Sequence, residues 1–210
     1  MISIYRFKPQ FQALLHPAAH ALHRFGLSAN QVTAFTCLAS ILLGIWLATH
    51  SEEIGWFLLV PLWCFLRMAL NAIDGIMARA FGEASVLGAY LNEMGDVISD
   101  AALYLPFALI AGASAELVVA VILLACLVEF AGVLGVLVGG VRCHDGPMGK
   151  SDRAFVFGAL GLAVGLGVPT ERWISVVLAA LAALLVVTAF NRMRSGIRRA
   201  RPGALGTSRK

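Results

Sequence analysis

The stretch that determines the fold class is residues 59–96, which read LVPLWCFLRMALNAIDGIMARAFGEASVLGAYLNEMGD. Its first half is an apolar run, and a helix of about 20 such residues is long enough to cross a bilayer. Its second half carries carboxylates at helical intervals. Because ionisable groups in membrane segments are costly and usually functional, this stretch predicts membrane helices with a functional site at one end.

The composition of the whole chain also indicates a membrane protein. Of the 210 residues, 60% are hydrophobic and only 13% are charged. In a typical soluble domain, roughly half of the residues are apolar and roughly a quarter are charged. A chain this apolar cannot bury its side chains in one globule, so many of them must face lipid or other helices. These values exclude a disordered protein, a disulfide scaffold and an ordinary cytosolic enzyme.

Six segments approach the length of a membrane span, and they cover residues 31–49, 54–79, 86–113, 117–138, 154–168 and 173–190. The fifth is short, so its helix is expected to begin in the polar residues before Ala154. The predicted fold is an all-α integral membrane protein with six transmembrane helices, which occupy residues 27–190.

The two ends of the chain are predicted to lie outside the spans. Residues 1–26 alternate between apolar and polar types, and Pro9 and Pro17 are expected to limit any continuous helix there. This pattern predicts an amphipathic segment lying on the membrane surface. Residues 191–210 are predicted to be a solvated basic tail that binds anionic lipid headgroups. Membrane lipid is therefore the expected partner of these basic residues, and no nucleic acid is expected.

The basic residues also predict the orientation of the chain. With six spans both ends lie on one side, and fourteen of the sixteen Lys and Arg residues lie on that side. The opposite loops hold four Glu and one Arg. Positive residues collect on the cytoplasmic side, so both termini are predicted to be cytoplasmic, in a multi-pass protein of a bacterial inner membrane.

Polar residues recur at helical spacing where the second and third spans approach the cytoplasmic side. The second span ends with Asn71, Asp74, Gly75, Ala78 and Arg79, and the third begins with Gly88, Asn92, Asp96 and Asp100. Residues three and four apart share a helix face. Such an oxygen-rich pocket suits a hard divalent cation. The alternative is a buried polar network that only holds two helices in register.

These residues resemble the signature of the CDP-alcohol phosphotransferases, six-span enzymes of phospholipid synthesis. That signature is DxxDGxxAR, about eight further residues, and GxxxDxxxD. The chain matches its spacing from Asn71 to Asp96, but Asn71 and Asn92 stand at the first and third aspartate positions. Residues 28–33, SANQVT, are similar to the family's Pro-Asn-x-x-Thr motif.

The resemblance implies the roles of the site residues. Asp96 is the expected general base, and Mg²⁺ or Mn²⁺, as one or two ions, is the expected cofactor. The expected metal ligands are Asp74, Asp96, Asn71, Asn92 and Asp100. The expected nucleotide-binding residues are Asp74, Gly75, Ala78, Arg79 and Gly88. Each Asn removes one negative charge, which is expected to weaken metal binding. Asp100 lies one turn beyond Asp96 and is expected to restore part of that charge.

Other polar residues have weaker assignments. Lys150, Arg153 and Arg142, in and after the fourth cytoplasmic loop, are the expected binding residues for the acceptor alcohol, although they could serve only to anchor a short span. Arg67 is expected to pair with one of the carboxylates. Glu129 has no obvious partner in the sequence. The pairs Gly135–Gly139 and Gly161–Gly165 favour close helix packing, either within the chain or in the homodimer that the family usually forms.

The predicted function is transfer of the phosphatidyl group of CDP-diacylglycerol to a small hydroxyl acceptor, with release of CMP. The sequence does not identify the acceptor. Two alternatives stay open: a catalytically impaired relative that binds lipid or nucleotide, and a small ion-coupled transporter. Release of CMP distinguishes the enzyme from both.

Overall fold

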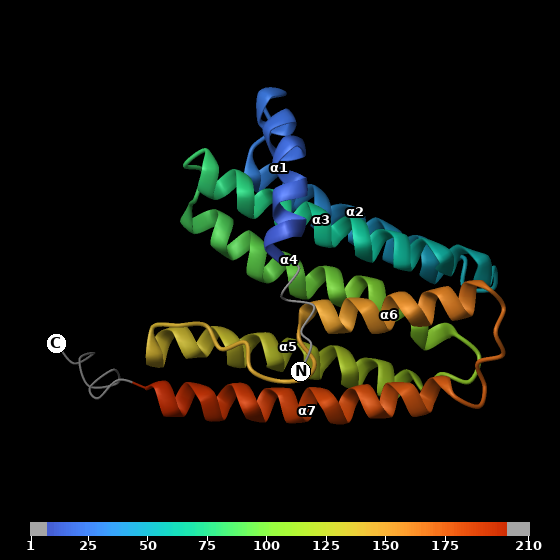
Figure 1. Ribbon diagram of the computed structural model, residues 1–210. Helices are drawn as coiled ribbons and strands as arrows, with labels where there is room; N and C mark the ends of the chain where they lie inside the picture. The colour runs from blue at the N-terminus through green and yellow to red at the C-terminus, as the bar shows by residue number, and fades with distance from the viewer. Residues whose placement is uncertain (1–7, 201–210) are drawn as a thin grey trace. The chain divides into compact units, whose positions relative to one another are not determined.

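The computed structural model describes residues 8–200, and this part of the chain is helical and contains no strand (Figure 1). The elements, in chain order, are α1 (Lys8–Arg24), α2 (Ala29–Thr49), η2 (Ile54–Leu58), α3 (Leu59–Ala80), α4 (Val86–Tyr104), η3 (Leu105–Leu109), α5 (Ala115–Gly139), α6 (Lys150–Gly165) and α7 (Ile174–Arg199). The prediction of an all-α protein is confirmed.

Within residues 8–200, four helical segments are long and apolar enough to cross a membrane. They are Ala29–Thr49, Ile54–Ala80, Ala115–Gly139 and Ile174–Arg199. The structure therefore supports an integral membrane protein. The other two predicted spans contain α4 and α6, which have 19 and 16 residues. Helix α6 begins at Lys150, so the prediction that it starts before Ala154 is confirmed.

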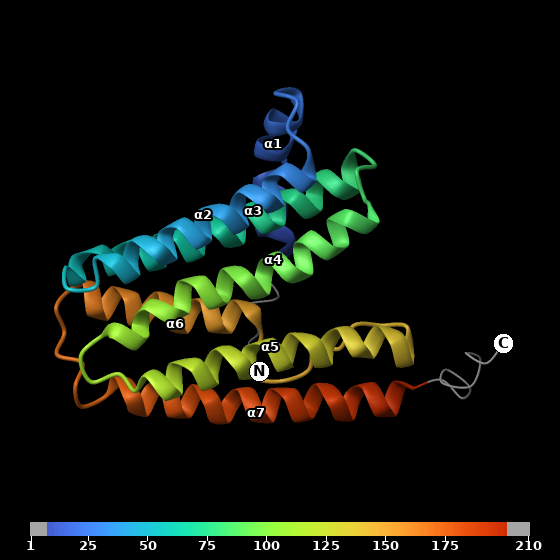
Figure 2. The same ribbon diagram turned by 180° about the vertical axis from the view of Figure 1, so that it is seen from behind.

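The chain divides into two compact units. The first consists of the described parts of Met1–Trp46 and Leu62–Leu103, and the second of Leu47–Pro61 and the described part of Tyr104–Lys210. Within the first unit, α2 and α3 run side by side in both views (Figures 1 and 2). Within the second unit, α5 and α7 do the same.

Helix α1 belongs to the first unit, and its course corrects one expectation. Ala19 on α1 is fully buried in a cluster with residues of α2 and α3, and Leu15 and Leu22 pack against the same cluster. The helix runs unbroken through Pro17, which was expected to limit it. Proline removes a single N–H and its helical bond. We attribute the continuity of the helix to the packing of its apolar face on either side of Pro17.

The first residues of α2 are held at the same end of this unit. Ser28 and Gln31 form a reciprocal cap, in which the Ser28 N–H donates to Gln31 Oε1 and the Gln31 N–H to Ser28 Oγ, at 2.9 and 3.3 Å. Glu83, in the turn after α3, accepts from the Ala29 N–H at 2.6 Å and contacts His23 Nδ1 at 3.0 Å. These bonds fix the start of α2 beside the end of α3.

Glycines allow close approach within the second unit. A side chain at Gly161 or Gly165 would collide with η2 and the start of α3. A side chain at Gly135 would collide with Cys143, and one at Gly139 would press against the end of α7. Both glycine pairs therefore serve contacts within the chain, which was one of the two predicted uses.

Candidate functional site

Asp74 lies on the face of α3 that packs against α2. Its side chain is buried, and the Thr33 hydroxyl of α2 donates to Asp74 Oδ2 at 2.7 Å. Thr33 comes from the motif that opens α2, so the cap at Ser28 places this hydroxyl beside the carboxylate. A bond to a charged acceptor is roughly twice as strong as a neutral one. Thr33 therefore fixes the orientation of Asp74.

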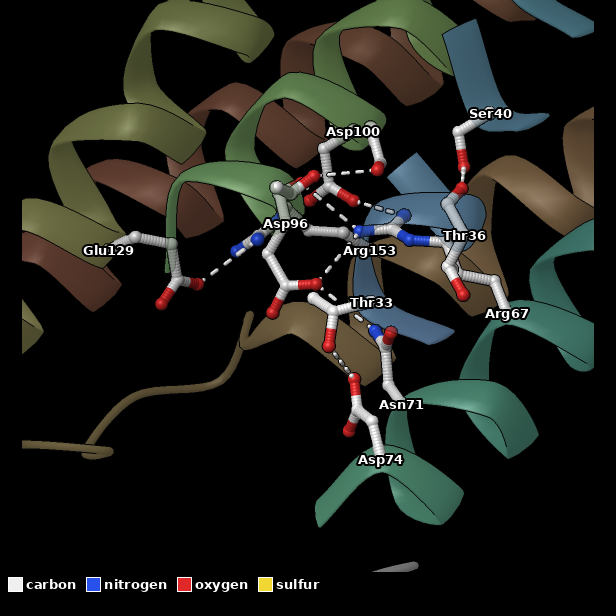
Figure 3. A network of polar contacts seen from close by, with 12 residues as sticks. Thr33, Thr36, Ser40, Arg67, Asn71, Asp74, Asp96, Asp100, Glu129 and Arg153 are labelled. Carbon is white, nitrogen blue, oxygen red and sulfur yellow. Dashed lines mark hydrogen bonds and ion pairs between the residues drawn. The ribbon is translucent and has the colours of Figure 1, made fainter. Parts of the chain in front are cut away.

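Asp96 lies on α4 and meets two side chains of α3. Asn71 Nδ2 donates to Asp96 Oδ1 at 3.0 Å, and Arg67 Nη2 lies 3.5 Å from the same oxygen. Arg67 Nη1 also donates to Asp100 Oδ1 at 2.5 Å. The prediction that Arg67 pairs with a carboxylate is confirmed. Figure 3 shows the carboxylates of Asp74 and Asp96 pointing toward one another, with Asn71 between their helices.

The predicted nucleotide-binding residues lie on the same two helices, where glycines make room for side chains of the protein. Arg79 is exposed, and its guanidinium lies over Gly75, 3.2 Å from where a Cβ would be. A side chain at Gly88 would collide with the Asn30 amide. Ala78 is half-buried. The space beside both glycines is therefore filled by Arg79 and Asn30, and the exposed guanidinium of Arg79 is the more movable of the two.

The predicted metal ligands do not form a cluster of carboxylates. Within residues 8–200, no three His, Cys, Asp or Glu side chains come together as a group that could hold an ion. Asp100 is buried against Arg67, and Asn92 is half-buried on α4. Asp74 and Asp96, whose carboxylates point toward one another in Figure 3, are bonded by Thr33 and Asn71, respectively. Two carboxylates with amide oxygens fit one hard cation that also binds substrate oxygens.

The second unit contains a buried cluster that the sequence did not reveal. Glu129 on α5 contacts Arg142, Arg153 and Arg192, with N–O distances of 2.7, 3.0 and 3.2 Å. Arg153 is 1% exposed and Arg192 is 3% exposed. We call these four residues the Glu129 cluster, in which one carboxylate contacts three guanidinium groups. Figure 3 shows its Arg153–Glu129 pair.

The Glu129 cluster contains two of the three predicted acceptor-binding residues. Arg142 and Arg153 belong to it, whereas Lys150 is half-buried at the first position of α6. Arg192 corrects a prediction, because it was assigned to a solvated tail. Helix α7 continues to Arg199, and the missing side chain at Gly132 makes room for the Arg192 guanidinium. Arg192 also donates to the Val128 carbonyl at 2.8 Å.

The chain is similar in sequence to two bacterial proteins. It is 43% identical to the inner membrane protein YnbA of Escherichia coli, over 92% of this chain and 96% of that protein. It is 28% identical to the phosphatidylinositol phosphate synthase of Mycobacteroides abscessus, over 93% of this chain and 88% of that protein.

The fold is similar to that of solved structures, and the sequence matches a family model. The phosphatidylinositol phosphate synthase PgsA1 of Mycobacterium tuberculosis with CDP-DAG bound matches with a TM-score of 0.75 and 23% identity, over 94% of this chain and all of that one. Its complex with manganese and citrate matches with a TM-score of 0.73 and 24% identity, over 93% of each chain. The CDP-alcohol phosphatidyltransferase model matches residues 27–144, which include α2 to α5 and the signature residues of α3 and α4. The chain therefore belongs to the CDP-alcohol phosphatidyltransferase family and is a phosphatidyltransferase of the membrane.

Proposed function

We propose that this enzyme transfers the phosphatidyl group of CDP-diacylglycerol to a small alcohol and releases CMP. The observation that carries the proposal is the pair of carboxylates Asp74 and Asp96, which face one another from α3 and α4. Each is oriented by a side-chain donor, Thr33 or Asn71. The relative with CDP-DAG bound supports the choice of donor.

In the reaction, the acceptor hydroxyl oxygen forms a bond to the phosphorus that carries diacylglycerol. The bond from that phosphorus to the bridging oxygen breaks, and CMP leaves with the electron pair. Asp96 accepts the hydroxyl proton, which is the role of a general base within hydrogen-bond reach. Gly75, Ala78, Arg79 and Gly88 are proposed to contact the nucleotide; Arg79, being exposed, can move toward it.

We propose Mg²⁺ or Mn²⁺ as the cofactor. Asp74 and Asp96 would hold it together with amide oxygens of Asn71 and Asn92, while Asp100 contributes through its ion pair with Arg67. A divalent ion would neutralise the diphosphate and stabilise the leaving group. A complex of a relative with manganese supports this cofactor.

The Glu129 cluster supports an acceptor that carries a negative charge. Its three guanidinium groups, with Lys150 nearby in sequence, suit a phosphate group on the acceptor. The names of the synthase relatives agree with a phosphorylated acceptor. We therefore propose a small phosphorylated alcohol, bound by Arg142, Lys150 and Arg153.

The proposed topology keeps six spans within residues 27–190, with α4 and α6 as the two shorter ones. Residues 1–26 lie on the cytoplasmic surface, 191–210 include the basic tail, and both termini and the active site are cytoplasmic. The inner-membrane relative supports this location in bacteria. The proposed assembly is a homodimer.

The function is tested with the purified full chain in nanodiscs that contain CDP-diacylglycerol. Matched acceptors, glycerol against glycerol 3-phosphate and inositol against inositol 1-phosphate, are added with Mg²⁺ or Mn²⁺. We expect CMP release with one phosphorylated member and little with its neutral partner, and mass spectrometry identifies the lipid product. Asp96→Asn serves as the inactive control. No CMP release with any acceptor, or with serine, would refute the proposed function.

A further inference from the structure

Glu83 lies in the turn that joins α3 to α4, and its carboxylate connects three segments of the first unit. Glu83 Oε2 accepts from the Ala29 N–H of α2 at 2.6 Å, and Oε1 lies 3.0 Å from His23 Nδ1 of α1. The Glu83 side chain is 22% exposed. It lies between the two halves of the family signature in the sequence and belongs to neither.

The conformation of the turn brings Glu83 to the start of α2. Gly82 has a φ of +71°, a left-handed conformation that residues with a Cβ rarely adopt. On one side of Gly82, the Phe81 ring stacks on the His23 imidazole with their centroids 3.8 Å apart. On the other side, Glu83 contacts the same imidazole. Helix α1 therefore holds the turn on both sides of Gly82.

The Glu83 carboxylate accepts from a backbone donor at the start of α2. The first N–H groups of a helix have no partner within the helix. Ser28 and Gln31 bond one another's N–H groups, and the N–H of Ala29 between them is bonded by Glu83. Ala29 is 4% exposed, so water has little access to replace this bond. A negative group is also favoured at a helix N-terminus, so Glu83 caps α2 from another part of the chain.

The first turn of α2 leads directly to the carboxylate of Asp74. Thr33 lies one turn after Ala29, and its hydroxyl oxygen lies 3.0 Å from the Ala29 carbonyl oxygen. The same hydroxyl donates to Asp74 Oδ2 at 2.7 Å. A movement of the first turn of α2 would therefore move the Thr33 hydroxyl relative to Asp74. Shifts of about 1 Å are enough to impair a catalytic site.

A second residue of the turn bonds the start of α2 and the start of α4. Asn30 Nδ2 donates to Ser85 Oγ at 3.3 Å, and the Gly88 N–H donates to the same oxygen at 3.0 Å. Two successive residues of α2 are therefore bonded to this turn. The shorter bond, at 2.6 Å, is the one to Glu83.

We infer that Glu83 is a positioning residue of the enzyme. By capping α2 from the turn between α3 and α4, Glu83 fixes the Thr33 hydroxyl against Asp74 and so sets the orientation of this carboxylate toward the divalent ion. His23 holds Glu83 from α1, which connects that helix to the site. The inference rests on the proposed function for the role of Asp74 as a metal ligand.

The test measures the dissociation constant of Mn²⁺ by electron paramagnetic resonance, with the full chain in nanodiscs that contain CDP-diacylglycerol. Glu83→Ala removes the acceptor of the Ala29 N–H and should weaken Mn²⁺ binding by about fivefold, the factor that corresponds to the loss of a helix cap. Glu83→Gln keeps an oxygen acceptor and should restore most of the affinity. The matched control is Glu116→Ala, which removes the acceptor of the Ser114 hydroxyl at the start of α5 and should leave the constant unchanged.

A double substitution distinguishes positioning from a structural role. Thr33→Val removes the hydroxyl and keeps the branched shape of the side chain. If Glu83 acts through Thr33, the protein with both Glu83→Ala and Thr33→Val should bind Mn²⁺ within about twofold of Thr33→Val alone. Single effects that multiply, or Mn²⁺ binding that is unchanged in either single variant, would overturn the inference. If Glu83→Ala does not fold, Glu83→Asp, which keeps the charge on a shorter side chain, replaces it in both comparisons.

CMP release from the same samples separates the inference from the proposed function. The expected order of Mn²⁺ constants without CMP release by the wild type would overturn the proposed function and leave the positioning role intact. CMP release by the wild type with equal Mn²⁺ constants in all variants would overturn the positioning role alone. No Mn²⁺ binding by the wild type would overturn both the proposed cofactor and the inference.

Discussion

Replacing Glu129 with Gln is expected to destabilise the second unit strongly. The substitution keeps the size of the side chain and one oxygen acceptor, but it removes the only negative charge of the Glu129 cluster. Arg153 and Arg192 are almost fully buried, and both lie within about 3 Å of the Glu129 carboxylate. The variant therefore removes the carboxylate that contacts all three guanidinium groups.

The magnitude follows from the burial of these groups. Breaking a buried ion pair by removing one partner costs about 3–5 kcal/mol. Glutamine still accepts hydrogen bonds, so we expect the lower end, a loss of about 3 kcal/mol in the free energy of unfolding. A matched control is Asp145→Asn, which removes the acceptor of the exposed Arg199–Asp145 pair, 3.7 Å apart. Exposed pairs contribute less than about 1 kcal/mol.

The assay is reversible unfolding in mixed micelles with increasing SDS, followed by circular dichroism. A free energy of unfolding for Glu129→Gln within 1 kcal/mol of the Asp145→Asn value would refute the reasoning. Inorganic phosphate provides a second measurement, because an anion can supply the missing charge. Phosphate should raise the melting temperature of Glu129→Gln more than that of the wild type, and an equal effect on both would count against the charge argument.

Three further substitutions test the first unit. Asp96→Asn should abolish CMP release while the protein stays folded, and residual release above one hundredth of the wild-type rate would contradict its role as general base. Asp100→Asn removes the closest partner of Arg67 and should lower the free energy of unfolding by about 3 kcal/mol; an unchanged value would show that this pair is not needed. Gly44→Ala places a Cβ against the backbone carbonyl of Ala102 and should cost about 1–3 kcal/mol in the same SDS assay, whereas no loss would mean that the helices can separate there.

Residue spacing was sufficient to predict the polar site of the first unit. Asn71 and Asp74 on one helix, and Asp96 and Asp100 on the next, recur at intervals that place them on one face. A turn of only a few residues joins the two helices, so the faces had to meet near that turn. The pairing of Arg67 followed from the same reasoning, because a cation one turn before Asn71 lies on the same face.

The Glu129 cluster could not be predicted in this way, because its members come from four different segments. Glu129 and Arg192 are 63 residues apart, and no periodicity along a single helix relates them. The signal that could have identified the cluster is the isolation of Glu129 in an apolar span. A buried carboxylate must have a partner, so Glu129 required a cation from another segment, and Arg192 lies within the apolar helix α7 and not beyond it.

Each unit contains a buried ion network in which one side chain contacts several groups of opposite charge. In the first unit, Arg67 contacts the carboxylates of Asp96 and Asp100. In the second unit, one carboxylate serves three guanidinium groups. In each network one side chain is shared by several partners, so its removal breaks more than one buried ion pair, and breaking one such pair costs about 3–5 kcal/mol. Substitution of the shared member, Arg67 or Glu129, should therefore cost more stability than substitution of any one of its partners.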